Sequence, residues 1–314
     1  MVNKTLPLIS GFVLFLLATA GHKWQEGITK KLSVAVMGIV LLTAVFHGIN
    51  LYEKSPAVTV WKLKEDIPIL LNLDDLGTVF STLVVFVWIL ITLYTFSYMK
   101  GDKKGVRFLG CHLMTLGMLM GITSAGNLVT MYLFYEGMTL ATIGYVIHAQ
   151  TKEAIAAGYK YVFYSIAGAF LGLIGFFYIY QLTPSIAFTP GGNFTHAAIA
   201  GHEMTLQLAV LGMIIGFGSK AGMFPLHGWL STAHPVAPAP ASAILSGVNT
   251  KMGVIAILRV VYYIAGADFL WKSFVQYIVI GLTLLTVFMG SMLAFKEKIM
   301  KRRLAYSTVS QVSY

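Results

Sequence analysis

Charged residues are scarce in this chain of 314 residues. Lysine, arginine, aspartate and glutamate together make up 11% of it, whereas a soluble globular domain carries about a quarter. Hydrophobic residues reach 57%, and many apolar runs approach the ~20 residues that cross a bilayer. The composition therefore excludes an ordinary soluble domain and predicts an all-α polytopic membrane protein.

Cysteine is nearly absent as well. The single Cys111 excludes a disulfide within the chain and a cysteine-based metal site. The sequence also lacks a phosphate-binding loop, a nucleophile–base pair, a metal-ligand cluster and a dinucleotide-binding glycine motif. We therefore expect no cofactor and no metal in this chain, and no chemistry of its own beyond moving protons or cations.

Apolar runs bounded by charges or by Gly, Pro and Asn predict about ten spans. Nine are expected at residues 6–21, 32–50, 77–98, 107–125, 128–148, 159–181, 205–224, 238–265 and 271–294. A tenth begins near Leu304 and stops at Tyr314. Its helix would rise about 16 Å, roughly half of the hydrocarbon thickness. Either the chain is a fragment, or a partner subunit completes that layer.

The net charge of +10 is explained by topology rather than by nucleic acid, because the cations lie in short loops between spans. One set of alternating loops holds fourteen of them: Lys23, Lys30, Lys31, Lys100, Lys103, Lys104, Arg107, Lys152, Lys160, Lys296, Lys298, Lys301, Arg302 and Arg303. In the opposite loops, among which we place Arg259, acidic residues lower the net positive charge. The positive-inside rule then places these fourteen cations in the cytoplasm and the N-terminus outside. We expect the chain in the cell membrane of a prokaryote.

An alternative reading of the first segment is a cleaved signal peptide. Ala18-Thr19-Ala20 resembles a signal-peptidase site after a short apolar run. Cleavage before Gly21 would invert every later loop and turn the fourteen cations outward. We therefore expect a retained span.

Three charges lie in the middle of long apolar runs: Glu136, Lys220 and Lys251. A charge at the bilayer centre costs about 3 kcal/mol on insertion scales, and above ~10 kcal/mol in simulations. Glu136 is either a structural hydrogen-bonding group between helices or part of an ion path. A nearby carboxylate would stabilise a protonated lysine, and separating the two would favour release of the proton. An acid and two amines can thus form a switchable proton path.

Lys220 lies in a stretch that predicts a broken helix. Gly216, Gly218, Gly222 and Pro225 surround it within ten residues, and such breaks line hydrated cavities in transporters. The alternative is a kinked helix with a snorkelling lysine. Lys251 follows Ser246, Asn249 and Thr250, which give the eighth span a polar face.

Two histidines and a third lysine are further candidates for the path. His227 and His234 lie in a proline-rich segment that runs from His227 to Pro240, and imidazole can relay protons. Each is alternatively structural or solvated. Lys160, at the start of the sixth span, is either a snorkelling cation or the point at which protons enter. We expect His112 and His148 to be interfacial.

At these residues the chain resembles the antiporter-like membrane subunits of complex I, Mrp-type Na⁺/H⁺ antiporters and membrane-bound hydrogenases. The resemblance runs from about Arg107 to the C-terminus. The matching stretches are Leu133-Phe134-Tyr135-Glu136 of the fifth span, Ala157-Gly158-Tyr159-Lys160-Tyr161, Gly218-Ser219-Lys220-Ala221-Gly222, Pro225-Leu226-His227-Gly228-Trp229-Leu230, Ala233-His234-x-x-Ala237-Pro238-x-Pro240-x-Ser242-Ala243, Gly247-Val248-x-x-Lys251-x-Gly253 and Arg302-Arg303-Leu304-Ala305-Tyr306-Ser307.

The resemblance implies roles and a domain plan. Glu136 would tune Lys220 on the broken seventh helix, and Lys251 on the eighth would pass protons inward, with His234 close to that route. Residues 1–106 would form three N-terminal helices, 107–265 the first five-helix repeat, and 266–314 the start of a second, inverted repeat that is largely absent. Ser231 and Tyr135 replace a proline and a tryptophan that the family often has.

The leading hypothesis is a proton- or sodium-translocating subunit of a redox-driven or antiporter complex, without an enzymatic site of its own. Its expected partners are other membrane subunits, one of which supplies the missing repeat, together with lipid and H⁺ or Na⁺. The alternatives are a scaffold subunit that has lost transport and a stand-alone secondary carrier. The sequence leaves open which ion is moved and which parent complex the chain joins.

Overall fold

The computed structural model describes residues 2–20, 28–53, 56–65, 67–183, 185–195 and 199–314. Gly21, which would follow the candidate cleavage site, lies outside these residues. The chain divides into two compact units. The first comprises residues 1–126, 130–155 and 237–244, and the second comprises 127–129, 156–236 and 245–314. Each unit is described by itself.

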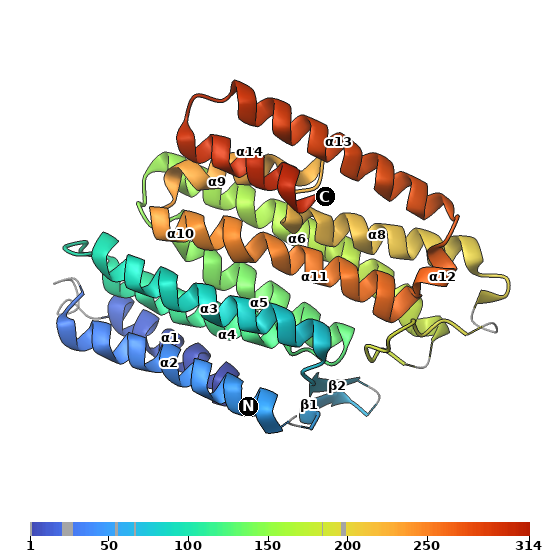
Figure 1. Ribbon diagram of the computed structural model, residues 1–314, viewed down its shortest axis with the longest axis horizontal. Helices are drawn as coiled ribbons and strands as arrows, with labels where there is room; N and C mark the ends of the chain where they lie inside the picture. The colour runs from blue at the N-terminus through green and yellow to red at the C-terminus, as the bar shows by residue number, and fades with distance from the viewer. Residues whose placement is uncertain (1, 21–27, 54–55, 66, 184, 196–198) are drawn as a thin grey trace. The chain divides into compact units, whose positions relative to one another are not determined.

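The first unit is a helical bundle with one small hairpin (Figure 1). Its elements are α1 Val2–Ala20, α2 Lys30–Glu53, β1 Val58–Lys64, β2 Ile67–Leu71, α3 Asp75–Tyr98, α4 Gly105–Thr123, most of α5 Leu128–Val146 and α10 Ala239–Ile244. Helix α4 is the most deeply buried of the candidate spans, with 83% of its apolar window inside the structure.

Glycines allow α1 and α4 to pack closely. A Cβ on Gly11 would lie 2.4 Å from the backbone nitrogen of Met114, and one on Gly110 would lie 2.7 Å from that of Phe15. Small residues at helix contacts are the usual means of association in membranes, where apolar side chains gain little by leaving lipid. This contact fixes α1 against the buried helix of its unit.

The antiparallel pair β1–β2 lies in a connection between two predicted spans. Val58, Val60 and Trp61 belong to a β-favouring run between Pro56 and Glu65. The backbone of Leu70 is tied to the unit through two bonds: its N–H donates to the Thr130 hydroxyl (2.8 Å), and its carbonyl accepts from Gly126 (2.9 Å). The expectation of an entirely α-helical chain is therefore wrong at this hairpin.

The second unit contains the interrupted helices. Its elements are most of α6 Lys152–Leu182, then α8 Glu203–Ala221, the 3₁₀ turn η2 Leu226–Trp229, α9 Leu230–Val236, the π-helical η3 Leu245–Asn249, α11 Thr250–Arg259, the π-helical η4 Val260–Ala265, α12 Ala267–Leu270, α13 Phe274–Lys296 and α14 Met300–Val312. Helices α13 and α14 pair along the second unit (Figure 1).

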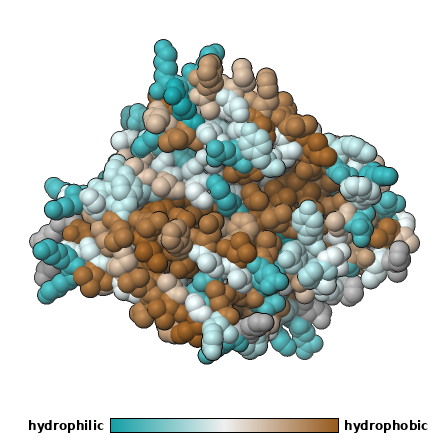
Figure 2. Space-filling view, in the orientation of Figure 1, coloured by the Kyte–Doolittle hydropathy of each residue, from teal (hydrophilic) through white to brown (hydrophobic). Residues whose placement is uncertain are grey.

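Each of the ten predicted spans coincides with a helix in the described residues. Seven of these are long and apolar enough to cross a membrane: residues 30–53, 75–98, 105–123, 152–182, 203–236, 239–265 and 274–296. Apolar side chains cover much of the visible face (Figure 2). Leu284 and Phe288 of α13 are among the large apolar side chains that are exposed. The chain is therefore a multi-pass membrane protein, while the count of ten and the repeat boundaries stay predictions.

The predicted interruption after Lys220 is confirmed. Helix α8 ends at Ala221, and Gly222 takes the left-handed conformation with φ 92°. The Met223 N–H then donates to the Gly218 carbonyl at 2.8 Å, which is the capping bond of a Schellman motif. The break therefore comes directly after the lysine, and helical structure resumes only at Leu226.

Candidate ion path

Lys220 is fully buried, with none of its surface exposed. Its ammonium group donates to the Ser165 hydroxyl at 3.2 Å and lies 5.1 Å from the centre of the Tyr161 ring. Both partners come from α6, where a spacing of four residues places them on one face. A charged amine thus has a hydroxyl and an aromatic face as surroundings, both of which favour a cation.

The backbone beside Lys220 is held by side chains of the same cluster. The Trp229 indole N–H donates to the Ser219 carbonyl at 2.8 Å, and the Ser219 hydroxyl donates to the Tyr164 carbonyl at 3.1 Å. Tyr161 and Trp229 pack with ring centroids 4.9 Å apart. Because Trp229 follows the break, these contacts tie both sides of the interruption to α6.

Lys160 and His227 meet in the same unit. The Lys160 amine lies 3.6 Å from the position that a Cβ on Gly228 would occupy, and it interacts electrostatically with His227. The His227 ring stacks on Phe224 at 5.7 Å. Helix α6 begins at Lys152 rather than near Tyr159, because Thr151 caps it by accepting from the Ala154 N–H. Lys160 was expected at the start of the sixth span. It lies about two turns inside helix α6.

Lys251 lies directly beyond a π-helical segment. Its ammonium group donates to the Ser246 carbonyl at 2.8 Å, and the Thr250 hydroxyl donates to the same oxygen at 2.9 Å. Lys251 is half-buried, whereas Asn249 and Thr250 are fully buried. π-Helical turns recur at functional sites, and here the turn presents a backbone oxygen to a lysine.

The helices that carry the two lysines are in direct contact. A Cβ on Gly253 would lie 2.6 Å from the Ala221 nitrogen and 2.8 Å from the Phe217 oxygen. This contact is two residues from Lys251 and one residue from Lys220. The structure therefore brings the neighbourhoods of Lys220 and Lys251 together within one unit, as it does those of Lys160 and His227.

His234 is buried on α9, with 1% of its surface exposed. It interacts electrostatically with Lys301, near the start of α14. Its predicted place beside the Lys251 route stays a prediction. Glu136 is half-buried on α5. It belongs to the first unit, while Lys220 belongs to the second, so their pairing also stays a prediction.

The expectation for His112 is wrong. Its ring is fully buried in the first unit, accepts or donates a hydrogen bond with the Thr92 hydroxyl at 2.8 Å and stacks on Trp88 at 4.6 Å. His148 pairs with the Asp102 carboxylate at 2.9 Å beyond the end of α5. Sequence position near a span end therefore did not distinguish a core histidine from one at a connection.

Arg259 is expected among the loop charges, but it is 1% exposed. Its guanidinium group lies over the rings of both Phe188 and Tyr263, 4.7 Å and 4.6 Å from their centres. Ser165 was also missed, although a serine in an apolar run four residues from Tyr161 was a detectable signal. Phe188 gave none, because it lies far from Arg259 in the sequence.

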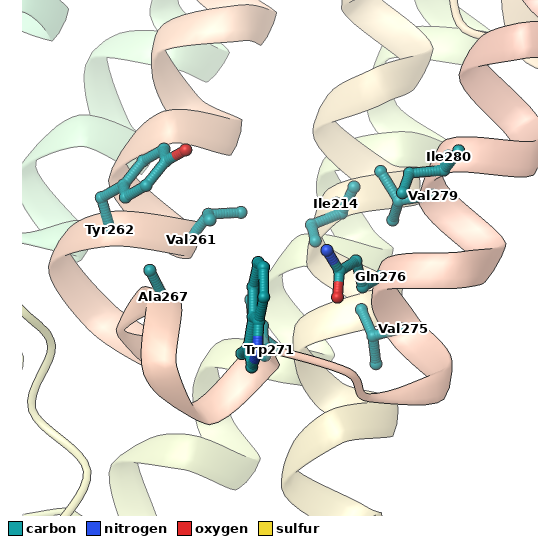
Figure 3. A pocket seen from close by; sticks show the side chains of 10 residues that line it. Ile214, Val261, Tyr262, Ala267, Trp271, Val275, Gln276, Val279 and Ile280 are labelled. Carbon is teal, nitrogen blue, oxygen red and sulfur yellow. The ribbon is translucent and has the colours of Figure 1, made fainter.

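A separate cleft of about 330 Å³ lies between α8, η4, α12 and α13 (Figure 3). Trp271 stands in it, with Val261 and Val279 on opposite sides. Its lining side chains carry no charge, and those with polar atoms are Tyr262, Trp271 and Gln276. The cleft is therefore apolar and distinct from the lysine cluster.

Among the described residues, no three His, Cys, Asp or Glu side chains come together as a metal site would require.

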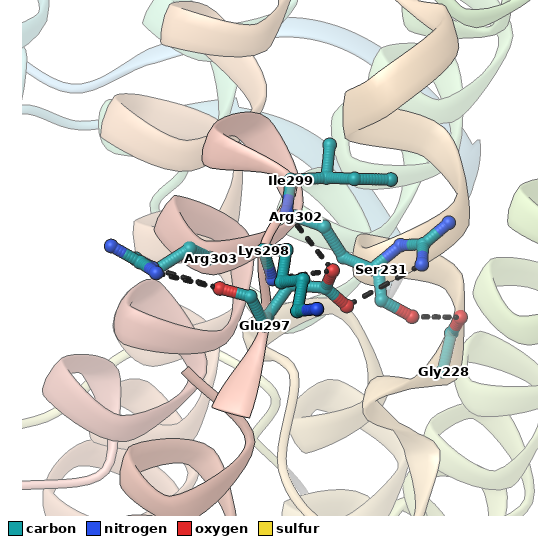
Figure 4. A network of polar contacts seen from close by, with 7 residues as sticks. All are labelled: Gly228, Ser231, Glu297, Lys298, Ile299, Arg302 and Arg303. Atoms are coloured by element: carbon teal, nitrogen blue, oxygen red, sulfur yellow. Dashed lines mark hydrogen bonds and ion pairs between the residues drawn. The ribbon is translucent and has the colours of Figure 1, made fainter. Parts of the chain in front are cut away.

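The basic connection between α13 and α14 is internally tied (Figure 4). The Glu297 carboxylate accepts from the N–H groups of Lys298 (3.0 Å) and Ile299 (3.1 Å) and from Arg302 (3.4 Å). The Glu297 carbonyl accepts twice from Arg303, at 3.0 Å and 2.8 Å. One residue thus fixes the direction in which α14 leaves the turn.

Residues 125–314 match the family described as NADH:quinone oxidoreductase/Mrp antiporter, transmembrane. Residues 64–109 match the N-terminal family of NADH-ubiquinone oxidoreductase (complex I) chain 5. Among curated relatives, a Na⁺/H⁺ antiporter subunit of Alkalihalophilus pseudofirmus is 26% identical and covers 98% of this chain and 62% of its own. Hydrogenase-4 component B of Escherichia coli is 28% identical, covering 96% of this chain and 45% of its own.

Solved structures share the fold. The membrane-bound sulfane sulfur reductase, an archaeal respiratory membrane complex, matches with a TM-score of 0.80 at 23% identity, over 99% of this chain and 62% of that one. The Mrp complex of Dietzia sp. matches with a TM-score of 0.77 at 22% identity, over the whole of this chain and 57% of that one. The chain therefore spans roughly half to two thirds of the length of these similar proteins.

Proposed function

Because the chain belongs to the NADH:quinone oxidoreductase/Mrp antiporter membrane family, we propose that it is an ion-translocating subunit of a larger membrane complex. Protons, or sodium ions in their place, would move through a half-channel whose central groups are Lys220 and Lys251. The single observation that carries the proposal is Lys220. It is a fully buried amine, held by Ser165 and Tyr161, at the point where its helix ends.

The chemistry follows from burial. An intramembrane amine is costly unless its surroundings stabilise it, and the Ser165 hydroxyl and the Tyr161 ring do so for the protonated form. A small movement of α6 against α8 would remove both contacts at once and release the proton. Lys251, held by the Ser246 carbonyl on the adjoining helix, is the next acceptor.

The remaining predicted residues have supporting roles in this proposal. Lys160 and His227, which lie together, would pass protons to the Lys220 site. His234 would join the route at Lys251, and Glu136 would set how tightly Lys220 holds its proton. The partners that complete the path would be other membrane subunits.

The test is Lys220→Met, which keeps the length of the side chain and removes the charge. The complex that copurifies with a tagged chain is reconstituted into vesicles. Proton movement is then followed with a pH-sensitive dye, with and without sodium. We expect at least a tenfold loss. Lys272→Met, at an exposed connection, is the matched control and should transport normally.

Normal pumping by an assembled Lys220→Met complex would overturn the proposal and favour a scaffold subunit. Transport of a small solute by the purified chain alone would favour a stand-alone carrier. Dependence of the signal on sodium distinguishes the two ions.

A further inference from the structure

Helix α14 reaches the Lys251 site through a pair of hydroxyl groups. The Ser246 and Thr308 hydroxyls are in direct hydrogen-bonding contact. Ser246 lies in the π-helical turn η3, and Thr308 lies on α14, where 7% of its surface is exposed. The two residues are 62 positions apart in the chain, so this contact is a tertiary one.

A hydroxyl group has one hydrogen, and the Thr308 hydroxyl lies 2.9 Å from the Leu304 carbonyl of its own helix, to which it can donate. When Thr308 uses its hydrogen in this bond, Ser246 is the donor in the contact between the two hydroxyls. The same serine supplies, through its carbonyl, the oxygen that accepts from Lys251 at 2.8 Å. Ser246 thus connects α14 with the lysine.

Helix α14 is itself firmly held. Glu297 fixes its start (Figure 4). Further along, the Ser310 hydroxyl pairs with Ser291 at 2.9 Å and lies 3.2 Å from the Val287 carbonyl, both on α13. Because α14 is anchored in this way, the Thr308 hydroxyl keeps a fixed position next to the π-helical turn η3.

We propose that Thr308 is a positioning residue for ion transfer. By accepting from the Ser246 hydroxyl, it holds η3 in the geometry in which the Ser246 carbonyl faces the Lys251 ammonium group. The inference rests on the proposed function, because it assigns to α14 the control of one of the two transfer lysines. A displacement of α14 would loosen Lys251 without touching it.

The experiment compares Thr308→Val with Thr308→Ser in the reconstituted complex. Valine keeps the shape and removes the acceptor, whereas serine restores it. We expect Thr308→Val to lower the rate of proton movement about tenfold, as the loss of a hydrogen bond that supports a charged group would, and Thr308→Ser to recover it. The pH at which the rate is half-maximal should also move in Thr308→Val, which a purely structural role would not cause.

Ser313→Ala is the matched control. It removes a hydroxyl at the end of the same helix that donates to the Val309 carbonyl of that helix at 3.2 Å, and it should leave the rate and its pH profile unchanged. If Thr308→Val fails to assemble, Ser246→Ala breaks the same bond from the other side and keeps the carbonyl.

Wild-type rate and pH profile in Thr308→Val would overturn the inference. Equal losses in Thr308→Val and Ser313→Ala would do so too, since they would show that removing any hydroxyl from α14 lowers the rate and that the Thr308 hydroxyl has no particular role. Lys220→Met separates the two levels: if that variant is inactive while Thr308→Val is normal, the inference fails and the proposed function stands.

Discussion

Two helical stretches of the second half of the chain differ in one respect that matters for function. Helix α13 runs without interruption from Phe274 to Lys296, and its only charged residue is the last one. The stretch from Ala239 to Ala265 contains two π-helical segments and carries Lys251 and Arg259. Of its apolar window, 61% is buried, against 11% for α13.

The difference shows where this protein tolerates charge. Lys251 follows one π segment, Arg259 directly precedes the other, and Lys220 lies one residue before the end of α8. A regular helix uses its own carbonyls, so it has little to offer a buried cation. An irregular segment can direct a backbone oxygen toward a side chain, as the Ser246 carbonyl accepts from Lys251. For Lys220, Lys251 and Arg259, buried charge and backbone irregularity therefore occur together, whereas Glu136 and Lys160 lie within the regular helices α5 and α6.

The largest expected effect comes from placing a charge in the regular helix. Leu284 lies near the middle of α13 and is 65% exposed. Leu284→Lys should oppose membrane insertion of the segment by about 3 kcal/mol, because no free backbone oxygen is available. A translocon insertion assay measures this. Phe295→Lys, at the helix end, is the control and should insert normally by snorkelling. Equal insertion of both variants would contradict the comparison.

Next in size is the effect of forbidding the break after Lys220. Gly222 has φ 92°, and a Cβ there would also lie 2.4 Å from Cδ1 of Leu230. Gly222→Ala should destabilise the fold by about 2 kcal/mol, since a left-handed alanine is strained. Thermal unfolding in detergent reports the change. Gly212→Ala, on the same helix with nothing within 4 Å of its Cβ, should not lower stability, and a similar loss there would count against the argument.

The break illustrates what the sequence could predict. Gly222 and Pro225 indicated it because they act on their own backbone, and the positions of the helices followed from apolar runs of sufficient length. The β1–β2 pair was missed, because a short alternating run between spans resembles a connection. The π segments left no local signal, since Leu245–Asn249 has an ordinary helical composition apart from Gly247.

The partners of the lysines could not be predicted for a different reason. Ser165 lies 55 positions from Lys220, and Thr308 lies 62 positions from Ser246. Sequence periodicity gives the face of a helix but not which other helix covers it. The charges of the candidate site were therefore found from the sequence, whereas the neutral groups that hold them required the fold.

A smaller effect is expected from removing a π segment. Deleting Gly247 should convert η3 to a regular α-helix and withdraw the Ser246 carbonyl from Lys251. We expect proton movement by the reconstituted complex to fall about tenfold, which corresponds to about 1.4 kcal/mol. Gly247→Ala keeps the length of the segment, and its Cβ would meet open space, so it should transport normally. Full activity of the deletion variant would show that the π-helical segment η3 is not needed for proton movement.

The smallest effect concerns the Glu297 carboxylate, which lies in the connection between α13 and α14. Because water can reach a charge there, its backbone hydrogen bonds should contribute little to stability. The pKa of the Glu297 carboxyl lies below its usual 4.5, first because it accepts from the Ile299 N–H, with Arg302 adding to the effect, and these contacts outweigh desolvation. A carboxyl group whose pKa is lower in the folded than in the unfolded chain stabilises the fold at any pH above its unfolded pKa. This contribution is lost as the pH falls through the folded pKa. The contribution is therefore complete at neutral pH.

Glu297→Gln should lower the thermal midpoint slightly at pH 7, and its difference from the wild type should shrink as the pH falls below 4.5 through the folded pKa of the carboxyl. Glu153→Gln, on an exposed acid in the first turn of α6, controls for charge alone. A loss that persisted at acid pH would mean that the shape of the turn, rather than the charge of Glu297, fixes α14. In that case the position of Thr308 would depend on the contacts that Ser310 makes with α13. Backbone contacts to charged side chains would then matter in this protein only at buried sites, such as those of Lys220 and Lys251.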